Sequence, residues 1–298
     1  MMARPISTSR VRRTLASVSL VVVAAACAGH GVPPIAPLPF ATDTVRAEVI
    51  ADGVVHRFIY APAGPWAIHV LDVDLSRCNA AVAVKGADAA AGRIRTTTML
   101  GGLSSTRRVV GGVNADFFSL VTGAPVGMLI VDGRMLSPPS ARPVLAFDSS
   151  GAPRIAEYSL IDSRLSPSYP REAVGGRPVL VRDSSVLDIV DDEGQPSFSV
   201  ARHPRTAAGI AARGRRLILA VVDGRQKPYS DGMSLRELAN LMRALGAREA
   251  INLDGGGSST MVYADPRADG RLRLANRPSD KEGERAVGDA LAIVHGCR

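Results

Sequence analysis

The 298-residue chain is poor in aromatic residues and in lysine. Phe, Trp and Tyr make up 4% of it, Trp66 is the only tryptophan, and only three of the 36 basic residues are lysines. No run of five basic residues occurs. A nucleic-acid-binding face needs a clustered basic stripe or aromatic platforms for the bases. The composition therefore argues against nucleic acid as a partner.

Long apolar runs are also lacking, except for one near the N-terminus. Residues 4–13 contain four arginines, residues 15–26 are mostly apolar, and small residues precede Cys27. The run is short for a membrane span, and this order is typical of an export signal. Residues 1–27 are therefore predicted to be a signal peptide. Without its four arginines the formal net charge falls from +8 to +4.

The end of the signal leaves two interpretations open. Residues 24–26 are alanines before Cys27, which resembles a bacterial lipobox, although alanine stands at 24 where leucine is usual. We favour lipidation of Cys27 over ordinary cleavage. The lipid would be the only membrane contact and would place the protein in the periplasm or on the cell surface. Residues 28–41 carry four prolines and are expected to form a semi-extended tether.

Cysteine is equally scarce, with Cys27, Cys78 and Cys297 alone. If Cys27 carries a lipid, the other two can form one disulfide in an oxidising compartment. That bond would close a loop of more than 200 residues. Two buried free thiols are the alternative. No CxxC pair or Cys/His cluster occurs, so a structural zinc site is not expected.

From residue 42 onward the apolar pattern is mainly that of strands. Residues 54–60 and 67–75 read as strands, whereas Ser234 and Glu237 have the capping-box spacing of a helix start. We expect an α+β fold over residues 42–298. It would be a single domain with a large twisted sheet, mixed or antiparallel, and a few packed helices.

Two carboxylates directly follow apolar strands in the C-terminal half. Residues 217–222 are a continuous apolar run, typical of a strand covered on both faces, and Asp223 follows it. Residues 250–253 form a shorter strand that ends at Asp254. If the two strands are neighbours with the same direction, both carboxylates emerge at one sheet edge.

The most informative segment is NLDGGGSST, residues 252–260. Its three glycines permit positive φ and close backbone approach, and their N–H groups with the serine hydroxyls could surround an anion. Apolar strands flank the segment closely, which disfavours a flexible linker, and no lysine follows the glycines as in a nucleotide-binding P-loop. A structural turn is the alternative. The candidate residues are Asp254, Gly255, Gly256, Gly257, Ser258 and Ser259.

Two other segments carry polar groups suited to a sugar or phosphate. In residues 202–206, Arg205 could clamp a phosphate oxygen and His203 could orient a substrate or serve as an acid. Surface arginines beside a turn proline are the alternative there. Asn114 could hydrogen-bond sugar hydroxyls, and the role of Asp116 is ambiguous.

Together these segments resemble the phosphodiester glycosidase family. The likeness covers about residues 80–295, and the family's usual Asn-Gly-Gly-Phe-Phe appears here as NADFF, so only Asn114 is carried over from it. The matching stretches are VNADFF (113–118), PVGMLIVDGR (125–134), RHPRTAAGI (202–210), VVDGR (221–225), NLDGGGSSTMV (252–262) and NRPS (276–279).

The resemblance implies hydrolysis of a sugar 1-phosphodiester at its glycosidic C–O bond in an envelope or extracellular glycoconjugate. Such chemistry passes through an oxocarbenium-like state, and donors around the departing phosphate stabilise it. Asp254 is assigned as the leading catalytic carboxylate and Asp223 as the second. The phosphate is assigned to Arg205 and the 255–259 loop, and substrate orientation to Asn114, His203 and Thr206.

Several alternatives stay open at this point. Asp254 is a nucleophile or a base depending on the carboxylate separation. A divalent cation at Asp254 or Asp223 is conceivable, and no other cofactor is indicated. The main alternative function is a non-catalytic envelope lipoprotein that binds phosphorylated polysaccharide. A phosphodiesterase that cuts the P–O bond fits less well, because the five histidines are scattered.

Overall fold

The computed structural model describes residues 1, 35–85, 92–167, 170–188 and 196–296. The signal peptide with Cys27 and the first part of the tether lie outside the described residues, so these assignments stay predictions. Val32–Arg298 forms one compact unit, distinct from Met1–Gly31.

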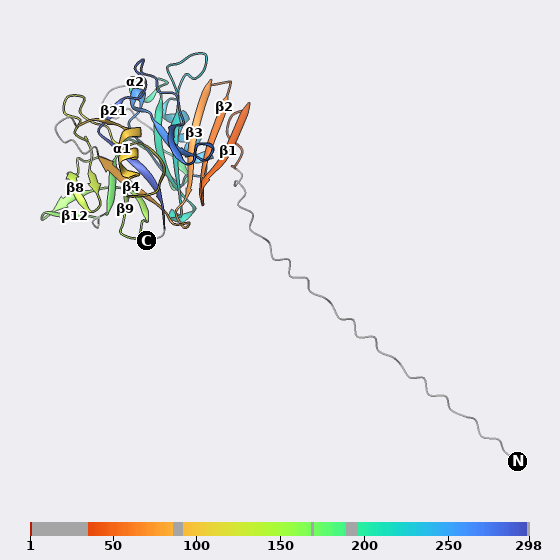
Figure 1. Ribbon diagram of the computed structural model, residues 1–298, viewed down its shortest axis with the longest axis horizontal. Helices are drawn as coiled ribbons and strands as arrows, with labels where there is room; N and C mark the ends of the chain where they lie inside the picture. The colour runs from red at the N-terminus through yellow and green to blue at the C-terminus, as the bar shows by residue number, and fades with distance from the viewer. Residues whose placement is uncertain (2–34, 86–91, 168–169, 189–195, 297–298) are drawn as a thin grey trace. The chain divides into compact units, whose positions relative to one another are not determined.

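Three antiparallel sheets make up most of this unit (Figure 1). Sheet A has the order β1 (Thr44–Ala51), β2 (Val54–Ala61), β3 (Trp66–Asp74), β17 (Arg216–Val222), β16 (Arg205–Ala211), β18 (Glu249–Asn252), β14 (Val179–Arg182), β15 (Ser185–Val186). Sheet B has the order β20 (Arg271–Leu274), β19 (Met261–Asp265), β6 (Val109–Asn114), β22 (Asp289–His295), β4 (Asn79–Lys85). Sheet C has the order β10 (Pro153–Glu157), β9 (Pro143–Phe147), β13 (Glu172–Gly175), β7 (Leu129–Val131), β8 (Arg134–Ser137).

The remaining elements are short. Two-stranded ribbons pair β11 (Ser159–Ile161) with β12 (Arg164–Ser166) and β21 (Ala286–Val287) with β5 (Ile94–Arg95). The α-helices are α1 (Thr96–Leu103), α2 (Pro196–Ser199) and α3 (Leu235–Ala244), and the 3-10 turns are η1 (Ala212–Gly214), η2 (Gly256–Ser258) and η3 (Pro266–Ala268).

Sheet A packs against sheets B and C over the central hydrophobic core. In β17, Leu217, Leu219 and Val221 belong to this core, whereas the alternate residues pack in a second core with α3. The predicted strand with two covered faces is therefore confirmed. The helix begins with the predicted capping box, in which Ser234 and Glu237 bond each other's backbone N–H groups.

The ends of β17 and β18 meet at one edge of sheet A. Both strands run antiparallel to β16, which lies between them, so they share a direction without being direct neighbours. The end of β6 in sheet B reaches the same place, because the Asp254 N–H donates to the Ala115 carbonyl over 2.9 Å. Asp223, Asp254 and the start of β16 at Arg205 therefore lie close together at this edge.

The α+β class is confirmed, and every strand pair between described residues is antiparallel. The strands divide among several sheets rather than one, as strongly twisted sheets of many strands usually do. No helix within the described ranges is long and apolar enough to cross a membrane.

The cysteine pairing stays a prediction, because Cys297 lies outside the described residues. The neighbouring Gly296 N–H donates to the Cys78 carbonyl over 2.9 Å. Gly296 therefore lies against Cys78, and its position is compatible with the predicted disulfide.

Candidate active site

Asp254 is a partly exposed residue directly after β18, and its carboxyl group lies in a largely desolvated environment. Its own Oδ1 accepts the Gly255 N–H at 2.9 Å, and the Asn114 side-chain amide donates to its carbonyl at 2.7 Å. Burial raises the pKa of Asp254 to about 6, while Ser258, the Gly255 N–H and Arg285 act in the opposite direction. At neutral pH the group is thus mainly an anion, held in a fixed position.

Two arginines lie over the glycine loop that follows. A Cβ built on Gly256 would come within 3.3 Å of both terminal nitrogens of Arg225. A Cβ on Gly257 would collide with the carboxylate of Asp280 and the guanidinium of Arg285. Glycine at both positions therefore lets cationic side chains approach the loop backbone.

The two arginines differ in how they are paired. Arg285 makes a bidentate contact with Asp280, at 2.7 and 3.1 Å, and both side chains are partly exposed. Arg225 is exposed, and its side chain bonds His203 Nδ1 at 3.2 Å. No carboxylate pairs with Arg225 within the part of the chain that the structure describes. Arg225 therefore supplies the less neutralised charge at the loop.

His203 acts as a neutral support for Arg225. A guanidinium only donates, so Nδ1 is the acceptor, and Nε2 carries the hydrogen that faces the Ser197 carbonyl at 3.3 Å. Burial, followed by the charges of Arg205 and Arg225, lowers the pKa of His203. The predicted role of this side chain as an acid is therefore not supported.

Asp223 is buried, with 1% of its surface exposed, and protein groups occupy both of its oxygens. Asn276 Nδ2 and the Arg277 N–H donate to Oδ1 at 3.0 Å, and the Tyr229 hydroxyl donates to Oδ2 at 3.1 Å. This arrangement fixes the segment from which the exposed Arg277 side chain projects over Tyr229. The geometry does not support the expected second catalytic carboxylate, because the side chain does not reach solvent.

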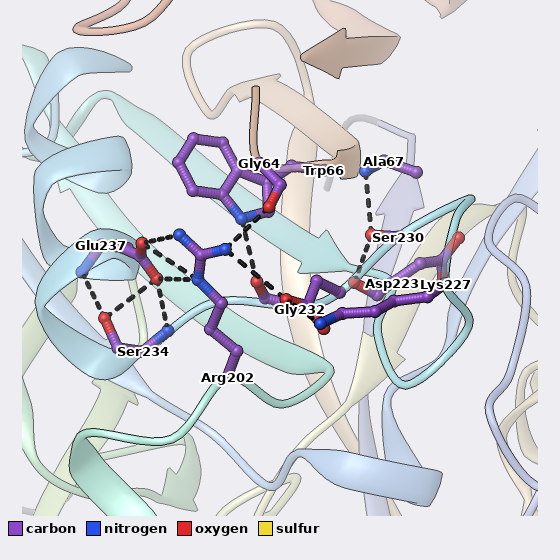
Figure 2. A network of polar contacts seen from close by, with 11 residues as sticks. Gly64, Trp66, Ala67, Arg202, Asp223, Lys227, Ser230, Gly232, Ser234 and Glu237 are labelled. Carbon is purple, nitrogen blue, oxygen red and sulfur yellow. Dashed lines mark hydrogen bonds and ion pairs between the residues drawn. The ribbon is translucent and has the colours of Figure 1, made fainter. Parts of the chain in front are cut away.

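A polar network anchors the loop between β17 and α3 (Figure 2). Arg202 pairs with Glu237 at 2.6 Å and donates to the Gly64 carbonyl at 2.7 Å. The Trp66 indole donates to the Gly232 carbonyl at 2.9 Å. Ser230 bridges the sheet to the site, accepting from the Ala67 N–H and donating to the Asp223 carbonyl. The loop that carries Arg225 is thus held at both ends.

Three predicted substrate contacts are buried and bond the protein instead. Arg205 is 2% exposed and donates to the carbonyls of residues 198, 201 and 233. Thr206 and Asn114 are fully buried and bond each other at 2.9 Å. Asn114 also accepts the Thr260 N–H at 3.0 Å. Direct contact of these side chains with a substrate is therefore not supported, and they position the loops instead.

The glycine loop also offers fewer N–H donors than predicted. The Gly255 N–H bonds Asp254, and the Gly256 N–H bonds the Pro204 carbonyl at 2.9 Å. The N–H groups of residues 258 and 259 close the 3-10 turn, and both serine hydroxyls are buried without a hydrogen-bond partner of good geometry among the described residues. Arginine side chains, rather than backbone N–H groups, are thus the main groups of the site that could bind an anion.

Metal ligation finds little support in this geometry. Across the described part of the chain, no three His, Cys, Asp or Glu side chains group as a metal site. Protein groups occupy both oxygens of Asp223.

The residues that the sequence alone missed are Arg225, Arg277 and Arg285. Arg225 and Arg277 lie in two of the stretches that carry the family resemblance, VVDGR and NRPS. Their place in these stretches is the sequence feature that could have identified them. Arg285 belongs to no such stretch, and only packing brings it to the loop.

Comparisons with known proteins identify relatives of this chain. A mouse N-acetylglucosamine-1-phosphodiester alpha-N-acetylglucosaminidase is 30% identical over 179 residues, which are 56% of this chain and 33% of the mouse protein. The match thus spans about a third of that relative's length.

Solved structures share the fold. The catalytic domain of the zebrafish N-acetylglucosamine-1-phosphodiester alpha-N-acetylglucosaminidase, auto-inhibited by its pro-peptide, has a TM-score of 0.62 and 22% identity over 86% of this chain and 83% of that chain. A Burkholderia pseudomallei protein provisionally described as exported has a TM-score of 0.63 and 19% identity over 88% of this chain and 98% of that one. A sequence model of the phosphodiester glycosidase family matches residues 107–294, more than half of the chain. The chain belongs to the phosphodiester glycosidase family.

Proposed function

We propose that this protein is an exported glycosidase that hydrolyses a sugar 1-phosphodiester at its glycosidic C–O bond. One observation carries the proposal. Asp254, a partly exposed residue, places its carboxylate at the start of a glycine loop over which Arg225 and Arg285 lie. A carboxylate beside cations suits a substrate whose sugar becomes cationic as its phosphate departs.

The roles follow from charge and exposure. Asp254 stabilises the cationic anomeric carbon, either by bonding to it or by activating water. Arg225 and Arg285 hold the phosphate, with Arg225 contributing more because Asp280 already neutralises Arg285. The bond between the anomeric carbon and the phosphate oxygen breaks, and the phosphate monoester leaves as an anion with that electron pair. The water oxygen joins the anomeric carbon, and one proton of that water is released to solvent by way of Asp254. Because that leaving group needs no proton, a second catalytic acid is not required, and Asp223 serves as a positioning residue.

The same proposal includes where the protein acts and which substrate it cleaves. The signal-like residues 1–27 support export, and a lipid on Cys27 with the tether at 28–41 would hold the domain near a membrane. The name of the mouse relative supports an N-acetylglucosamine 1-phosphodiester as the first substrate class to examine. An envelope or extracellular glycoconjugate is the proposed source of such bonds.

The test is hydrolysis in water labelled with oxygen-18. The purified protein is incubated with a panel of sugar 1-phosphodiesters, including UDP-N-acetylglucosamine, and the products are analysed by mass spectrometry. Label in the released sugar, lost in Asp254→Asn and kept in the exposed-turn control Asp162→Asn, is the expected result. Label in the phosphate would mean P–O cleavage and overturn the proposal. Tight binding of the intact substrates without turnover would favour a polysaccharide-binding lipoprotein.

A further inference from the structure

A second pair of carboxylates lies buried beneath the site. Asp116, after β6, and Asp289, at the start of β22, are 1% and 0% exposed. The Asp116 N–H donates to Asp289 Oδ1 at 2.7 Å, and the Gly127 N–H donates to Asp116 Oδ2 at 2.6 Å. The other oxygen of each group is buried and has no hydrogen-bond partner among the described residues.

The surrounding chain leaves room for this pair. A Cβ built on Gly175 would lie 2.6 Å from Asp116 Oδ2, and one on Gly127 would lie 2.8 Å from the same atom. Two glycines from separate segments thus accommodate one carboxyl group. The carboxyl group is therefore an integral part of the interior.

Two full negative charges in this space would be strongly unfavourable. Burial and the neighbouring Asp289 raise the pKa of Asp116, while Arg142 and nearby backbone N–H groups act in the opposite direction. Burial also raises the pKa of Asp289, as does Asp254, against the positive charge of Lys85. Lys85 is itself bonded to the carbonyl of Gly288 at 3.1 Å. The charges of Lys85 and Arg142 oppose these shifts without reversing them, so the pKa of each buried carboxyl group stays raised.

We propose that one of the two buried carboxyl groups, Asp116 or Asp289, keeps its proton, and that the two form a positioning pair whose full ionisation sets the alkaline limit of the site. The pair contacts the segment that holds Asp254. The Ala115 N–H donates to the Asp289 carbonyl at 3.3 Å, and the Ala115 carbonyl accepts the Asp254 N–H at 2.9 Å. Repulsion between two ionised carboxylates would push residues 115–116 away from β22 and displace Asp254.

The direction of the pH effect follows from linkage. Because folding raises the pKa of the pair, the unfolded chain releases these protons at lower pH than the folded chain does. The free energy of unfolding therefore falls as the pH rises from the ordinary Asp range, about 4, through the higher folded value. The wild-type melting temperature should decrease on the alkaline side.

Asparagine tests this directly, because its amide resembles the protonated acid and does not ionise. The full chain, Asp116→Asn, Asp289→Asn and the exposed control Asp162→Asn are melted between pH 5.5 and 9.5. We expect either interior variant to flatten the alkaline decrease and the control to retain it. The activity profile, which rests on the proposed function, should have its alkaline limb shifted upward by about one pH unit in Asp116→Asn. Wild-type pH dependence of melting in both interior variants would overturn the proposal.

Two measurements on the wild-type protein cover the case in which the variants do not fold. Infrared spectroscopy at neutral pH should show the carbonyl band of a buried protonated carboxylic acid, and its absence would overturn the proposal. Elemental analysis should find no bound metal ion. A stoichiometric cation that chelation removes, with a loss of thermal stability, would assign the pair to a metal instead. Melting, infrared and elemental measurements need no substrate, so their outcome is independent of the glycosidase proposal.

Discussion

The guanidinium of Arg225 lies over Gly256, and a Cβ at that glycine would come within 3.3 Å of both terminal nitrogens. Gly256 also has a φ of +62°, in the left-handed region. The glycine suits this backbone conformation, and an added Cβ would shift the end of the Arg225 side chain by a few tenths of an ångström. This contact joins the turn after β17 to the loop after β18, two motifs about 30 residues apart in the sequence.

Gly256→Ala should reduce kcat/KM by roughly two- to fivefold, because the added methyl group shifts the guanidinium of Arg225 from its position over the loop. The measurement is steady-state kinetics on a sugar 1-phosphodiester. Gly270→Ala is the control, since Gly270 has a φ of +73° and open space around the added atom. Both variants carry the same kind of backbone strain, about 1 kcal/mol. Equal activity in the two variants would contradict the proposed clearance role.

Arg225→Gln should raise KM for a phosphodiester by about 10- to 100-fold, because one charge-assisted contact with the phosphate is lost. Arg213→Gln is a matched control, since Arg213 is also exposed and has a positive φ of 56°. The control should keep the wild-type KM. Loss of kcat without a change in KM would assign Arg225 to the transition state alone.

The activity should fall on the acid side as Asp254 takes up a proton. Burial raises the pKa of Asp254 to about 6, so the anionic form that stabilises the sugar cation is lost below that pH. A plot of kcat/KM against pH should therefore have an acid limb near 6 in the free enzyme. An acid limb near 4, the ordinary range of an aspartate, would indicate a different group.

Arg205→Lys should lower stability more than it changes substrate binding. Arg205 donates to carbonyls of residues 198, 201 and 233, and a lysine reaches them with different geometry. A loss of about 2–4 kcal/mol is expected in denaturant unfolding. Arg182→Lys, at an exposed strand end, should be nearly neutral. A large rise in KM with unchanged stability would restore Arg205 as the phosphate clamp.

Reduction of the predicted disulfide between Cys78 and Cys297 should destabilise the domain. In the chain-entropy model, a loop of this length accounts for roughly 4–5 kcal/mol. The measurements are thiol titration of the unfolded chain and melting with and without a reductant. Cys78→Ser should melt like the reduced protein. Reactive thiols at both positions, with no effect of the reductant, would show that the cysteines are unpaired.

The sequence predicts those features that local spacing controls. The continuous apolar run of residues 217–222 predicts a strand packed on both faces, because its two sets of side chains meet two different cores. The spacing of Ser234 and Glu237 identifies the start of α3, because a capping box involves only neighbouring residues. The glycine run after Asp254 marks the site, because close approach to a backbone excludes a Cβ.

Which charged side chains face the site is decided by packing over long distances. The sequence points to Arg205 as the phosphate ligand and not to Arg225, yet β16 buries the first and the turn after β17 exposes the second. Asp223 and Asp254 both follow apolar strands, yet segment 276–277 covers only Asp223.

The sequence by itself determined the strands with a clear apolar pattern, the helix cap, the glycine loop and the family. Each of these features depends on short runs of neighbouring residues. The tertiary structure alone decided which arginines flank the loop, which aspartate reaches solvent, and that Asp116 meets Asp289 across 173 residues. The physical reason is desolvation. Burial depends on contacts between distant segments, and it determines whether a charged group binds a substrate, supports a loop or holds a proton.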